Sequence, residues 1–199
     1  MDVRSVSRVL TIDTVEAAYR RGLFPMAHPP SKVITWHCPA RRAILPLYEF
    51  HLSRSLERTI RLARFSVRFD TAFEKVIRAC ANRPSEETWI SEEIIGVYCS
   101  LHRAGKAHSV EVWVDGELVG GLYGVHLGGA FFAESKFHRV RDMSKVALAG
   151  LVFRLRERGF ALLEVQYLTP HLARLGAREI SHREYMALLS QALEKEIGF

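Results

Sequence analysis

The most regular alternation of apolar and polar positions runs from His108 to Phe137. Three alternating segments are separated there by Asp115-Gly116 and Gly128-Gly129, dipeptides that favour tight hairpin turns, so the pattern predicts three antiparallel strands. The next segment, residues 142–158, has apolar positions at helical spacing and predicts a long helix. A short apolar run with polar interruptions, residues 162–168, then predicts a further strand.

Strand, strand, strand, helix and strand is an order typical of acyltransferases whose substrate crosses a splayed sheet. We therefore predict an α+β fold with an N-acetyltransferase-like (GNAT) mixed sheet, in which the helix crosses over to a parallel strand. A chain with this fold is expected to be an enzyme that moves an acyl group.

The first part of the chain differs from the rest because prolines interrupt it. Residues 11–22 predict a short helix capped by Asp13 or Thr14, and three prolines between residues 24 and 30 exclude a helix there. Further patterns predict strands at 33–36 and 66–69 and helices beginning near 53, 72 and 91. We therefore expect a small, loop-rich N-terminal lobe, residues 1–42, and a GNAT-like transferase domain, residues 43–199.

The composition is that of an ordinary globular chain, with 199 residues and a net charge of +6. No apolar run reaches the roughly 18–20 residues that cross a bilayer, and the first residues lack the apolar core of a signal peptide. The cysteines form no C-x-x-C pair, so reduced cysteines in a cytoplasmic protein are expected. We expect no membrane partner, and a monomer.

Several kinds of catalytic centre are not indicated. The nine histidines are scattered without an H-E-x-x-H motif, so no metal site is expected, and neither a G-x-S-x-G elbow nor a Walker loop occurs. CoA-dependent enzymes of this fold place a glycine-containing turn before the crossover helix, but residues 139–145 contain no glycine, and Asp142 puts negative charge there. Lys145 could still contact a phosphate or a ribose. Gly120 and Gly124 indicate close backbone approach within a strand, and no cofactor is expected.

A basic stripe is predicted on the helix that begins near residue 53. Between residues 41 and 68 the chain has seven arginines and two glutamates. Helical spacing places on one face Arg54, Arg58 and Arg61. The opposite face carries the apolar residues Leu52, Leu56, Ile60 and Ala63. Such a stripe indicates either a solvated helix face or a polyanionic partner, of which nucleic acid is the commonest.

Three polar residues interrupt apolar strands. Glu164 and Gln166 are two residues apart, so they should share one face of a strand and leave to the other face Leu163, Val165 and Tyr167. The strand follows the crossover helix and should be internal, where polar side chains need partners. Glu134 interrupts the preceding strand, and a carboxylate there either pairs with an arginine or receives a cationic substrate.

Collinear motifs occur between residues 14 and 185, over most of the chain. They include Ala-Tyr-Arg-Arg-Gly-Leu-Phe-Pro (18–25), Ser-Arg-Ser (53–55), Thr-Trp-Ile (88–90), His-Ser-Val-Glu-Val-Trp (108–113), Leu-Val-Gly-Gly-Leu-Tyr-Gly-Val (118–125), Glu-Ser (134–135), Ser-Lys (144–145) and Leu-Gly-Ala-Arg-Glu-Ile (175–180). In this order they resemble the leucyl/phenylalanyl-tRNA–protein transferase family.

The resemblance implies transfer of a leucyl or phenylalanyl group from its tRNA to a protein with N-terminal Arg or Lys, which marks that protein for degradation (the N-degron pathway). It implies that Glu164 and Gln166 form the catalytic pair and that Glu134 binds the basic acceptor residue. For the aminoacyl-adenosine it implies contacts with Met26, Trp89, Tyr98, Leu122, Leu148 and Leu151. For the tRNA acceptor stem it implies contacts with Arg54 and Arg61, to which we add Arg58, on the same helix face, and Lys145.

The sequence departs from the family pattern at three positions. Glu164 replaces the usual Asp, Met26 stands where some members have Trp, and Lys136 interrupts the usual Gly-Glu-Ser-Met-Phe-Ser-Arg motif. We expect Lys136 to share the strand face of Glu134 and to weaken capture of a basic N-terminus, or to disfavour Leu and Phe if it touches the donor pocket. The alternatives are a transferase with altered donor or acceptor specificity, a tRNA-binding protein that has lost catalysis, and a CoA-dependent N-acetyltransferase.

Overall fold

The structure, a computed structural model, describes residues 3–7, 10–28, 33–62, 64–82 and 88–199. Within these ranges, seven strands form a mixed sheet in the order β10-β4-β9-β8-β7-β6-β5. Its strands are β4 (Arg41–Ile44), β5 (Ser66–Phe69), β6 (Ala107–Val114), β7 (Glu117–Leu127), β8 (Ala130–His138), β9 (Leu162–Gln166) and β10 (Arg178–Ser181). In the same ranges, every helix is too short or too polar to span a membrane.

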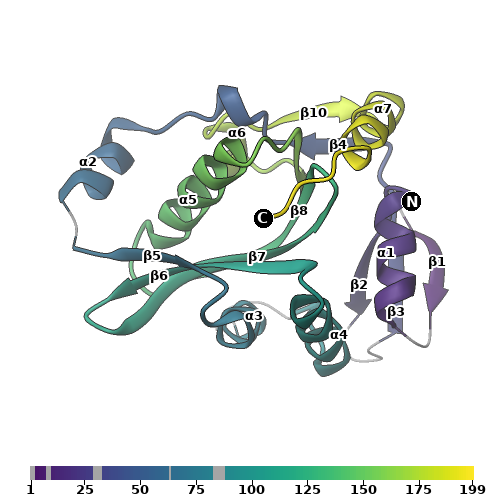
Figure 1. Ribbon diagram of the computed structural model, residues 1–199, viewed down its shortest axis with the longest axis horizontal. Helices are drawn as coiled ribbons and strands as arrows, with labels where there is room; N and C mark the ends of the chain where they lie inside the picture. The colour runs from purple at the N-terminus through teal and green to yellow at the C-terminus, as the bar shows by residue number, and fades with distance from the viewer. Residues whose placement is uncertain (1–2, 8–9, 29–32, 63, 83–87) are drawn as a thin grey trace.

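The three predicted strands and both hairpin turns are confirmed. β6, β7 and β8 pair antiparallel. Asp115, Gly116 and Gly128 have φ angles of +48°, +83° and +56°, as tight primed turns require. Helix α5 (Met143–Glu157) leads from β8 to β9, and these two strands pair in parallel. The predicted mixed sheet with a crossover helix is therefore confirmed (Figure 1).

Two glycines of β7 allow neighbouring backbone to approach closely. A Cβ atom on Gly120 would lie 2.6 Å from Cβ of Met143, and one on Gly124 would lie 2.3 Å from the carbonyl oxygen of Phe132. Neither position has room for a side chain. The prediction of close backbone approach is thus confirmed, and the first contact lets α5 begin directly against β7.

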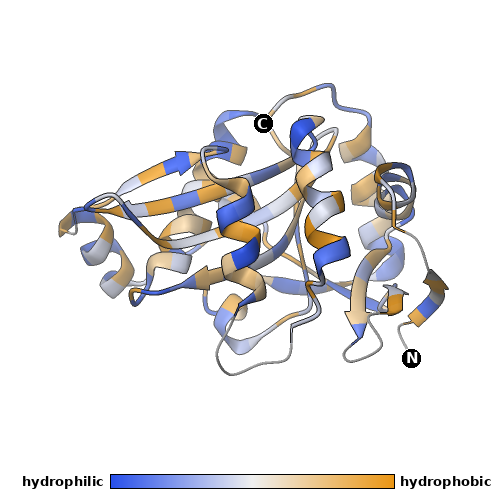
Figure 2. Cartoon of the chain, turned by 90° about the horizontal axis from the view of Figure 1, so that it is seen from below, coloured by the Kyte–Doolittle hydropathy of each residue, from blue (hydrophilic) through white to orange (hydrophobic). Residues whose placement is uncertain are grey.

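Helices cover both faces of the large sheet (Figure 1). One hydrophobic cluster contains α5 and Leu56 of α2 (Arg54–Leu62), and we call this side the α5 face. The other cluster, on the α4 face, contains residues of α3 (Phe73–Ala81), α4 (Glu92–Arg103) and α7 (His182–Leu193). Figure 2 shows α3 and α4 in front, with hydrophilic and hydrophobic residues mixed along each helix. This mixture is expected of helices with one buried side.

The N-terminal part contains a helix and a second sheet. Helix α1 (Ile12–Arg20) begins at Thr11, whose side chain accepts from the N–H of Thr14, so the predicted caps at Asp13 or Thr14 are wrong. The cap lies one turn earlier because Thr14 is the reciprocal partner in a capping box. The antiparallel sheet has the order β1-β3-β2. Its strands are β1 (Val3–Ser7), β2 (Phe24–His28) and β3 (Val33–His37).

Proline is accommodated in this small sheet because β2 is its edge strand, where a missing N–H costs no ladder bond. The expected lobe boundary at residue 42 falls inside β4, which already belongs to the large sheet. Elements that the sequence pattern did not predict are β1, β2, β4, β10, α7, the 3-10 helix η1 (Leu47–Glu49) and α6 (Pro170–Ala173).

The two central strands β8 and β9 are paired at one end only. Their register joins Ala130–Phe132 to Leu162–Glu164. Beyond this point β8 continues to His138, whereas β9 ends at Gln166, which pairs with β4 instead. The sheet is therefore splayed where the predicted catalytic residues lie.

Candidate active site

Gln166, the last residue of β9, has a left-handed backbone with a φ of +61°. Its N–H donates to Oε1 of Glu164 over 2.8 Å. The register with β4 is irregular there, with Ala43 opposite Gln166 and Ile44 opposite Glu164. A left-handed glutamine costs roughly 1–2 kcal/mol, so surrounding contacts must hold it in place. Strain of this kind concentrates at functional sites.

The turn at Gln166 changes the predicted alternation of side chains. Leu163 and Val165 pack on the α5 face, as predicted. The predicted place of Tyr167 beside them is wrong, because its ring packs edge-on against Phe24 at 5.7 Å on the α4 face. A left-handed residue interrupts the period of two on which that prediction depends.

Glu164 is held by a buried arginine that the sequence pattern did not reveal. Arg42 on β4 is 2% exposed, and its Nε lies 3.3 Å from Oε1 of Glu164, which is fully buried. The guanidinium also lies 4.9 and 4.5 Å from the ring centroids of Phe24 and Tyr185. It donates to the carbonyl of Gly22. Because a single buried charge is costly, each member of the pair stabilises the ionised form of the other.

Glu134 lies on a bulge of β8 that separates it from Lys136. Leu122 of β7 is opposite Lys136 and Gly124 is opposite Ala133, so β8 has one residue more than β7 between these pairs. Lys136 therefore shares the face of Leu122, the α5 face, whereas Glu134 contacts residues of the α4 face. The predicted shared face of Glu134 and Lys136 is wrong, because a bulge reverses the alternation of a strand.

Glu134 is the centre of a buried hydrogen-bond network. Nε2 of Gln166 donates to its Oε2 over 3.1 Å, and the hydroxyl of Tyr19 donates to its Oε1 over 2.5 Å. The hydroxyls of Tyr19 and Tyr98 are 2.7 Å apart. Tyr19 comes from α1 and Tyr98 from α4, so the network joins the N-terminal part to both splayed strands. Sequence reasoning missed Tyr19, although it lies in a motif that the family resemblance includes.

Burial dominates the acid–base properties of this network. It raises the pKa of Glu134 to about 8, and the nearby charge of Glu164 adds to the shift. Burial also raises the pKa of Glu164, although its arginine partner and the N–H of Gln166 oppose that rise. Burial, together with the charge of Glu134, raises the pKa values of Tyr19 and Tyr98 well above those of an ordinary tyrosine. Both tyrosines are therefore neutral hydrogen-bond donors near neutral pH.

The network combines groups of different chemical character at one point. A carboxyl group with a pKa near 8 can exchange a proton with an amine of similar pKa, and as a carboxylate it can bind a cation. The amide of Gln166 adds a neutral donor that can stabilise a developing oxyanion. Such a centre suits the attack of an amine on an activated carbonyl group.

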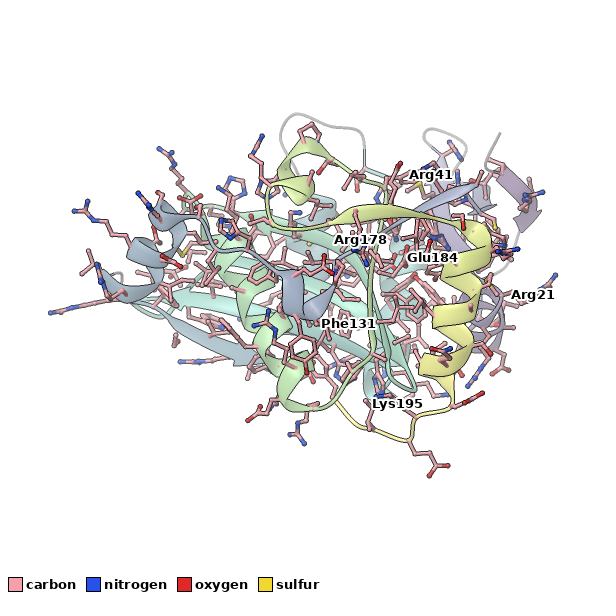
Figure 3. All side chains as sticks on the ribbon, turned by 90° about the horizontal axis from the view of Figure 1, so that it is seen from above. Arg21, Arg41, Phe131, Arg178, Glu184 and Lys195 are labelled. Atoms are coloured by element: carbon pink, nitrogen blue, oxygen red, sulfur yellow. The ribbon has the colours of Figure 1, made fainter. Side chains whose placement is uncertain are left out.

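The leucines predicted to line a donor pocket lie in the core between α5 and the sheet. Leu122, Leu148 and Leu151 are each at most 2% exposed. Phe131, labelled in Figure 3, belongs to the same cluster. The structure therefore brings these residues together but closes the space between them to solvent.

The residues predicted to bind adenosine lie on the α4 face. Tyr98 is fully buried within the network. Met26 and Trp89 are half-buried against the same core, and the carbonyl of Trp89 accepts from the N–H of Ala27 over 3.3 Å. Strand β2 thereby holds Trp89 just before α4, and Met26 and Trp89 keep partly exposed surfaces on which a ligand could pack.

The basic stripe on α2 lies on an exposed helix face, as predicted. Its three arginines are exposed on the surface opposite the buried Leu56: Arg54, Arg58 and Arg61. Leu52 and Ile60 are half-buried, and Ala63 lies outside the described residues. Figure 3 shows nitrogen-tipped side chains that extend from α2 away from the sheet.

Lys145 lies apart from the stripe, in the first turn of α5. Its Nζ is 2.6 Å from the carboxylate of Asp142, which stands at the start of that helix with a φ of +67°. Asp142 thus places an acidic side chain at the N-cap of α5. Among the described residues, no group of three or more His, Cys, Asp or Glu could hold a metal ion.

Comparison with solved structures finds chains that share part of the architecture. A ribosomal-protein-alanine N-acetyltransferase from Brucella melitensis matches with a TM-score of 0.39 and 15% identity over 56% of this chain and 87% of that one. The L-PGS structure from Bacillus licheniformis matches with a TM-score of 0.49 and 10% identity over 92% of this chain and 71% of that one.

Comparison of sequences is more specific. The model of the leucyl/phenylalanyl-tRNA protein transferase family matches residues 44–190, and that of its N-terminal domain matches residues 8–40. The leucyl/phenylalanyl-tRNA–protein transferase of Chlorobaculum parvum is 53% identical over 96% of this chain and 100% of its own length. Those of Rubrobacter xylanophilus and Gloeobacter violaceus are 54% and 55% identical over 96% and 92% of this chain, and over 98% and 94% of their own lengths. This chain belongs to the leucyl/phenylalanyl-tRNA protein transferase family.

Proposed function

We propose that this chain moves a leucyl or phenylalanyl group from its tRNA to the N-terminal arginine or lysine of an acceptor protein, which is thereby marked for degradation. The observation that carries the proposal is the hydrogen bond between Gln166 and Glu134, at the point where β8 and β9 part in a chain of this family. This bond joins the proposed catalytic amide to the proposed acceptor site.

The reaction needs little activation of its substrates. The α-amine of the acceptor attacks the carbonyl carbon of the aminoacyl ester, a C–N bond forms, the C–O bond to the ribose breaks, and the proton of the amine passes to the ribose oxygen. An aminoacyl ester is already activated, so orientation and stabilisation of the oxyanion supply most of the acceleration. The α-amine has a pKa of roughly 7.7–8.0, so a substantial fraction is neutral at cellular pH.

Gln166 and Glu164 have different roles in this proposal. The amide of Gln166 contacts the reacting atoms, donating to the ester carbonyl or orienting the amine. Glu164 is fully buried, and its Oε1 meets both the N–H of Gln166 and the guanidinium of Arg42, so it positions Gln166. A glutamate has one methylene more than the usual aspartate, and this reach allows a single oxygen to make both contacts.

Glu134 is the proposed site for the basic acceptor residue. An incoming guanidinium or ammonium group favours the carboxylate form and lowers the pKa of Glu134 from about 8. The bulge turns Lys136 to the other face of the strand, so acceptor capture does not have to compete with that lysine. This arrangement supports acceptors with N-terminal Arg or Lys.

The donor is proposed to enter through the partly exposed surfaces of Met26 and Trp89. Stacking of the terminal base on Trp89 would contribute roughly 1–3 kcal/mol. Tyr98 supports the network through the contact between its hydroxyl and that of Tyr19. The side chain of the esterified amino acid enters the closed core around Leu122, Leu148 and Leu151 and displaces the packing there. The arginines of α2, with Lys145, bind the acceptor stem. One chain supplies every group that this proposal uses, so a monomer suffices. Because the substrate is aminoacyl-tRNA, the reaction is proposed to take place in the cytoplasm.

Transfer of labelled leucine or phenylalanine from charged tRNA to short peptides tests the proposal. Peptides that begin with Arg, Lys or Asp are compared, with acetyl-CoA as a separate donor. Label on the Arg and Lys peptides alone is expected. Label on the Asp peptide would indicate altered specificity, tRNA binding without transfer would indicate lost catalysis, and turnover with acetyl-CoA would overturn the use of tRNA.

A further inference from the structure

A cavity of about 1390 Å³ opens beside the splayed end of β8. It is bounded by α3, the β6–β7 hairpin, the end of β8 and the first turn of α5. The side chains of the buried catalytic network do not line it among the described residues. Its charged lining consists of the cations Lys75, Arg78, Lys136, Arg139, Arg141 and Lys145 and of the carboxylates Glu117 and Asp142.

Lys136 belongs to this cavity because of the bulge at Glu134. The bulge turns Glu134 into the buried network and sends Lys136, two residues further along β8, to the cavity side. The pKa of His171, which also lines the cavity, reflects a positive electrostatic potential there. This pKa is lowered by partial burial and then by repulsion from Lys136, Lys145 and Arg174. Lys136 and Lys145, which come from two separate segments, therefore lie near His171 in the lining of the cavity.

Carboxylates pair with part of this positive charge, since Arg78 contacts Glu74 at 2.9 Å and Glu92 at 3.0 Å. Asp142 is shared by two cations, with Nζ of Lys145 at 2.6 Å and Nε of Arg141 at 3.7 Å. The side chain of Arg141 is 93% exposed, so its charge also reaches solvent. The lining further includes Trp113, which is partly exposed. Cations that follow a groove with interleaved aromatic rings are typical of sites for single-stranded nucleic acid.

A second cavity of about 440 Å³ connects this site to the arginine stripe. Arg64 and Arg68, which follow α2 along the chain, line it, and it shares Trp113 and Gly116 with the larger cavity. The guanidinium of Arg68 lies 5.3 Å from the ring centroid of Trp113. Asp115 also lines this second cavity, and with two arginines against one aspartate the path from α2, past the β6–β7 hairpin, to the strand that carries Glu134 is basic on balance.

We propose that the larger cavity binds nucleotide phosphates, and that these are the phosphodiesters of the unpaired 3′ end of the tRNA. The inference rests on the proposed function, because that function supplies an RNA whose end must reach Glu134 and Gln166. Lys136 is then a substrate-positioning residue for RNA. Side chains hold the phosphates, because Asp142 occupies the start of α5, where backbone amides would otherwise bind an anion.

The test compares two uncharged RNAs, intact tRNA and the same tRNA without its unpaired 3′ end, by fluorescence anisotropy at several salt concentrations. The variant is Lys136→Gln with Arg141→Gln. Its control is Arg21→Gln with Arg183→Gln, which removes the same charge from exposed positions just after α1 and on α7. A denaturation midpoint equal to that of the wild type establishes that each variant folds.

Intact tRNA is expected to bind the cavity variant about tenfold more weakly at low salt, with a salt slope smaller by about 1.4 for two single-strand phosphate contacts. The truncated tRNA and the control should change little. Equal losses for both RNAs, or none, would overturn the proposal. Lost binding of ATP, with both RNAs unchanged, would overturn the assignment to RNA and indicate a free nucleotide.

The outcome is independent of catalysis because the RNAs carry no amino acid. If the cavity variant loses affinity for intact tRNA alone, and the wild type transfers no label to any peptide, the cavity site is supported and the proposed reaction is contradicted. If the wild type transfers label to Arg and Lys peptides, and the wild type and the variant bind intact tRNA equally well, the reaction is supported and the cavity site is contradicted.

Discussion

Two groups of charged side chains differ in nearly every physical respect. Arg42, Glu164 and Glu134 are buried, and their polar contacts are made inside the protein. The arginines of α2 are exposed on the surface of the protein. Buried charges interact strongly and are little screened, whereas an exposed ion pair contributes at most about 1 kcal/mol and weakens with salt.

Under the proposed function, this difference separates the chemistry from RNA affinity. The geometry of the buried network is set during folding, because breaking one buried contact leaves its partner unsatisfied. Affinity for RNA is the sum of small, independent contacts that respond to salt. Substitutions in the buried network should therefore change stability or turnover, and substitutions on α2 should change binding alone.

The largest effect is expected for Arg42→Met. The substitution leaves Glu164 buried without its cation, and removal of one partner from a buried pair typically costs about 3–5 kcal/mol. The free energy of unfolding, measured with urea, should fall by that amount. An unchanged urea midpoint would mean that the ion pair between Arg42 and Glu164 contributes nothing to the stability of the folded protein.

A double variant separates lost charge pairing from lost packing. Arg42→Met with Glu164→Gln has no buried charge at either position, so most of the stability should return. Turnover should stay low, because an amide does not anchor the N–H of Gln166 as a carboxylate does. If the double variant were as unstable as Arg42→Met, packing against Phe24 and Tyr185 would explain the loss instead.

Substitution of Gln166 should affect turnover most. If its amide donates to the developing oxyanion, Gln166→Ala should lower kcat roughly 10²–10³-fold and leave the Kd for tRNA unchanged. Gln166→Gly should be equally inactive but more stable than Gln166→Ala by about 1 kcal/mol, because glycine adopts a positive φ freely. Equal losses of kcat and tRNA affinity would contradict a catalytic role.

The sequence predicted those parts of the fold that local patterns determine. The hairpins at Asp115-Gly116 and Gly128-Gly129, the crossover helix and the helices α3 and α4 follow from turn residues, capping and periodicity. β4 and β10 were not predictable in this way. Each is four residues long. Arg178–Ser181 pairs with Arg41–Ile44, from which most of the sequence separates it, so only this long-range pairing defines the two strands.

The site was predictable in its residues but not in its contacts. Glu134, Glu164 and Gln166 stand out because they interrupt apolar strands, and the structure brings them together. Arg42 gave a weaker signal, a cation just before the apolar run 43–45. The bulge at Glu134 has no local sequence mark, so the side to which Lys136 points could not be inferred.

Glu134 should make stability depend on pH. In the folded protein its pKa is about 8, against an ordinary 4.5, so the folded state holds a proton that the unfolded chain has lost. Stability attributable to this residue therefore falls as pH rises from about 4.5 to about 8, by up to about 1.4 kcal/mol per pH unit. Urea denaturation at several pH values should show this slope. Glu134→Gln should reduce the slope and leave the contribution of Glu164, whose pKa is also raised by burial. An unchanged slope in that variant would assign the pH dependence elsewhere.

The smallest effect is expected for Arg58→Gln on α2. The residue is exposed, so the free energy of unfolding should change by less than about 0.5 kcal/mol. If Arg58 contacts a phosphate of the acceptor stem, the plot of log K against log salt should lose about 0.7–0.9 from its slope, equally for intact and 3′-truncated tRNA. Arg183→Gln on α7 is the matched control. A slope identical to that of the wild type would make the stripe a solvated helix face, and the RNA would then have to be held by the cavity residues alone.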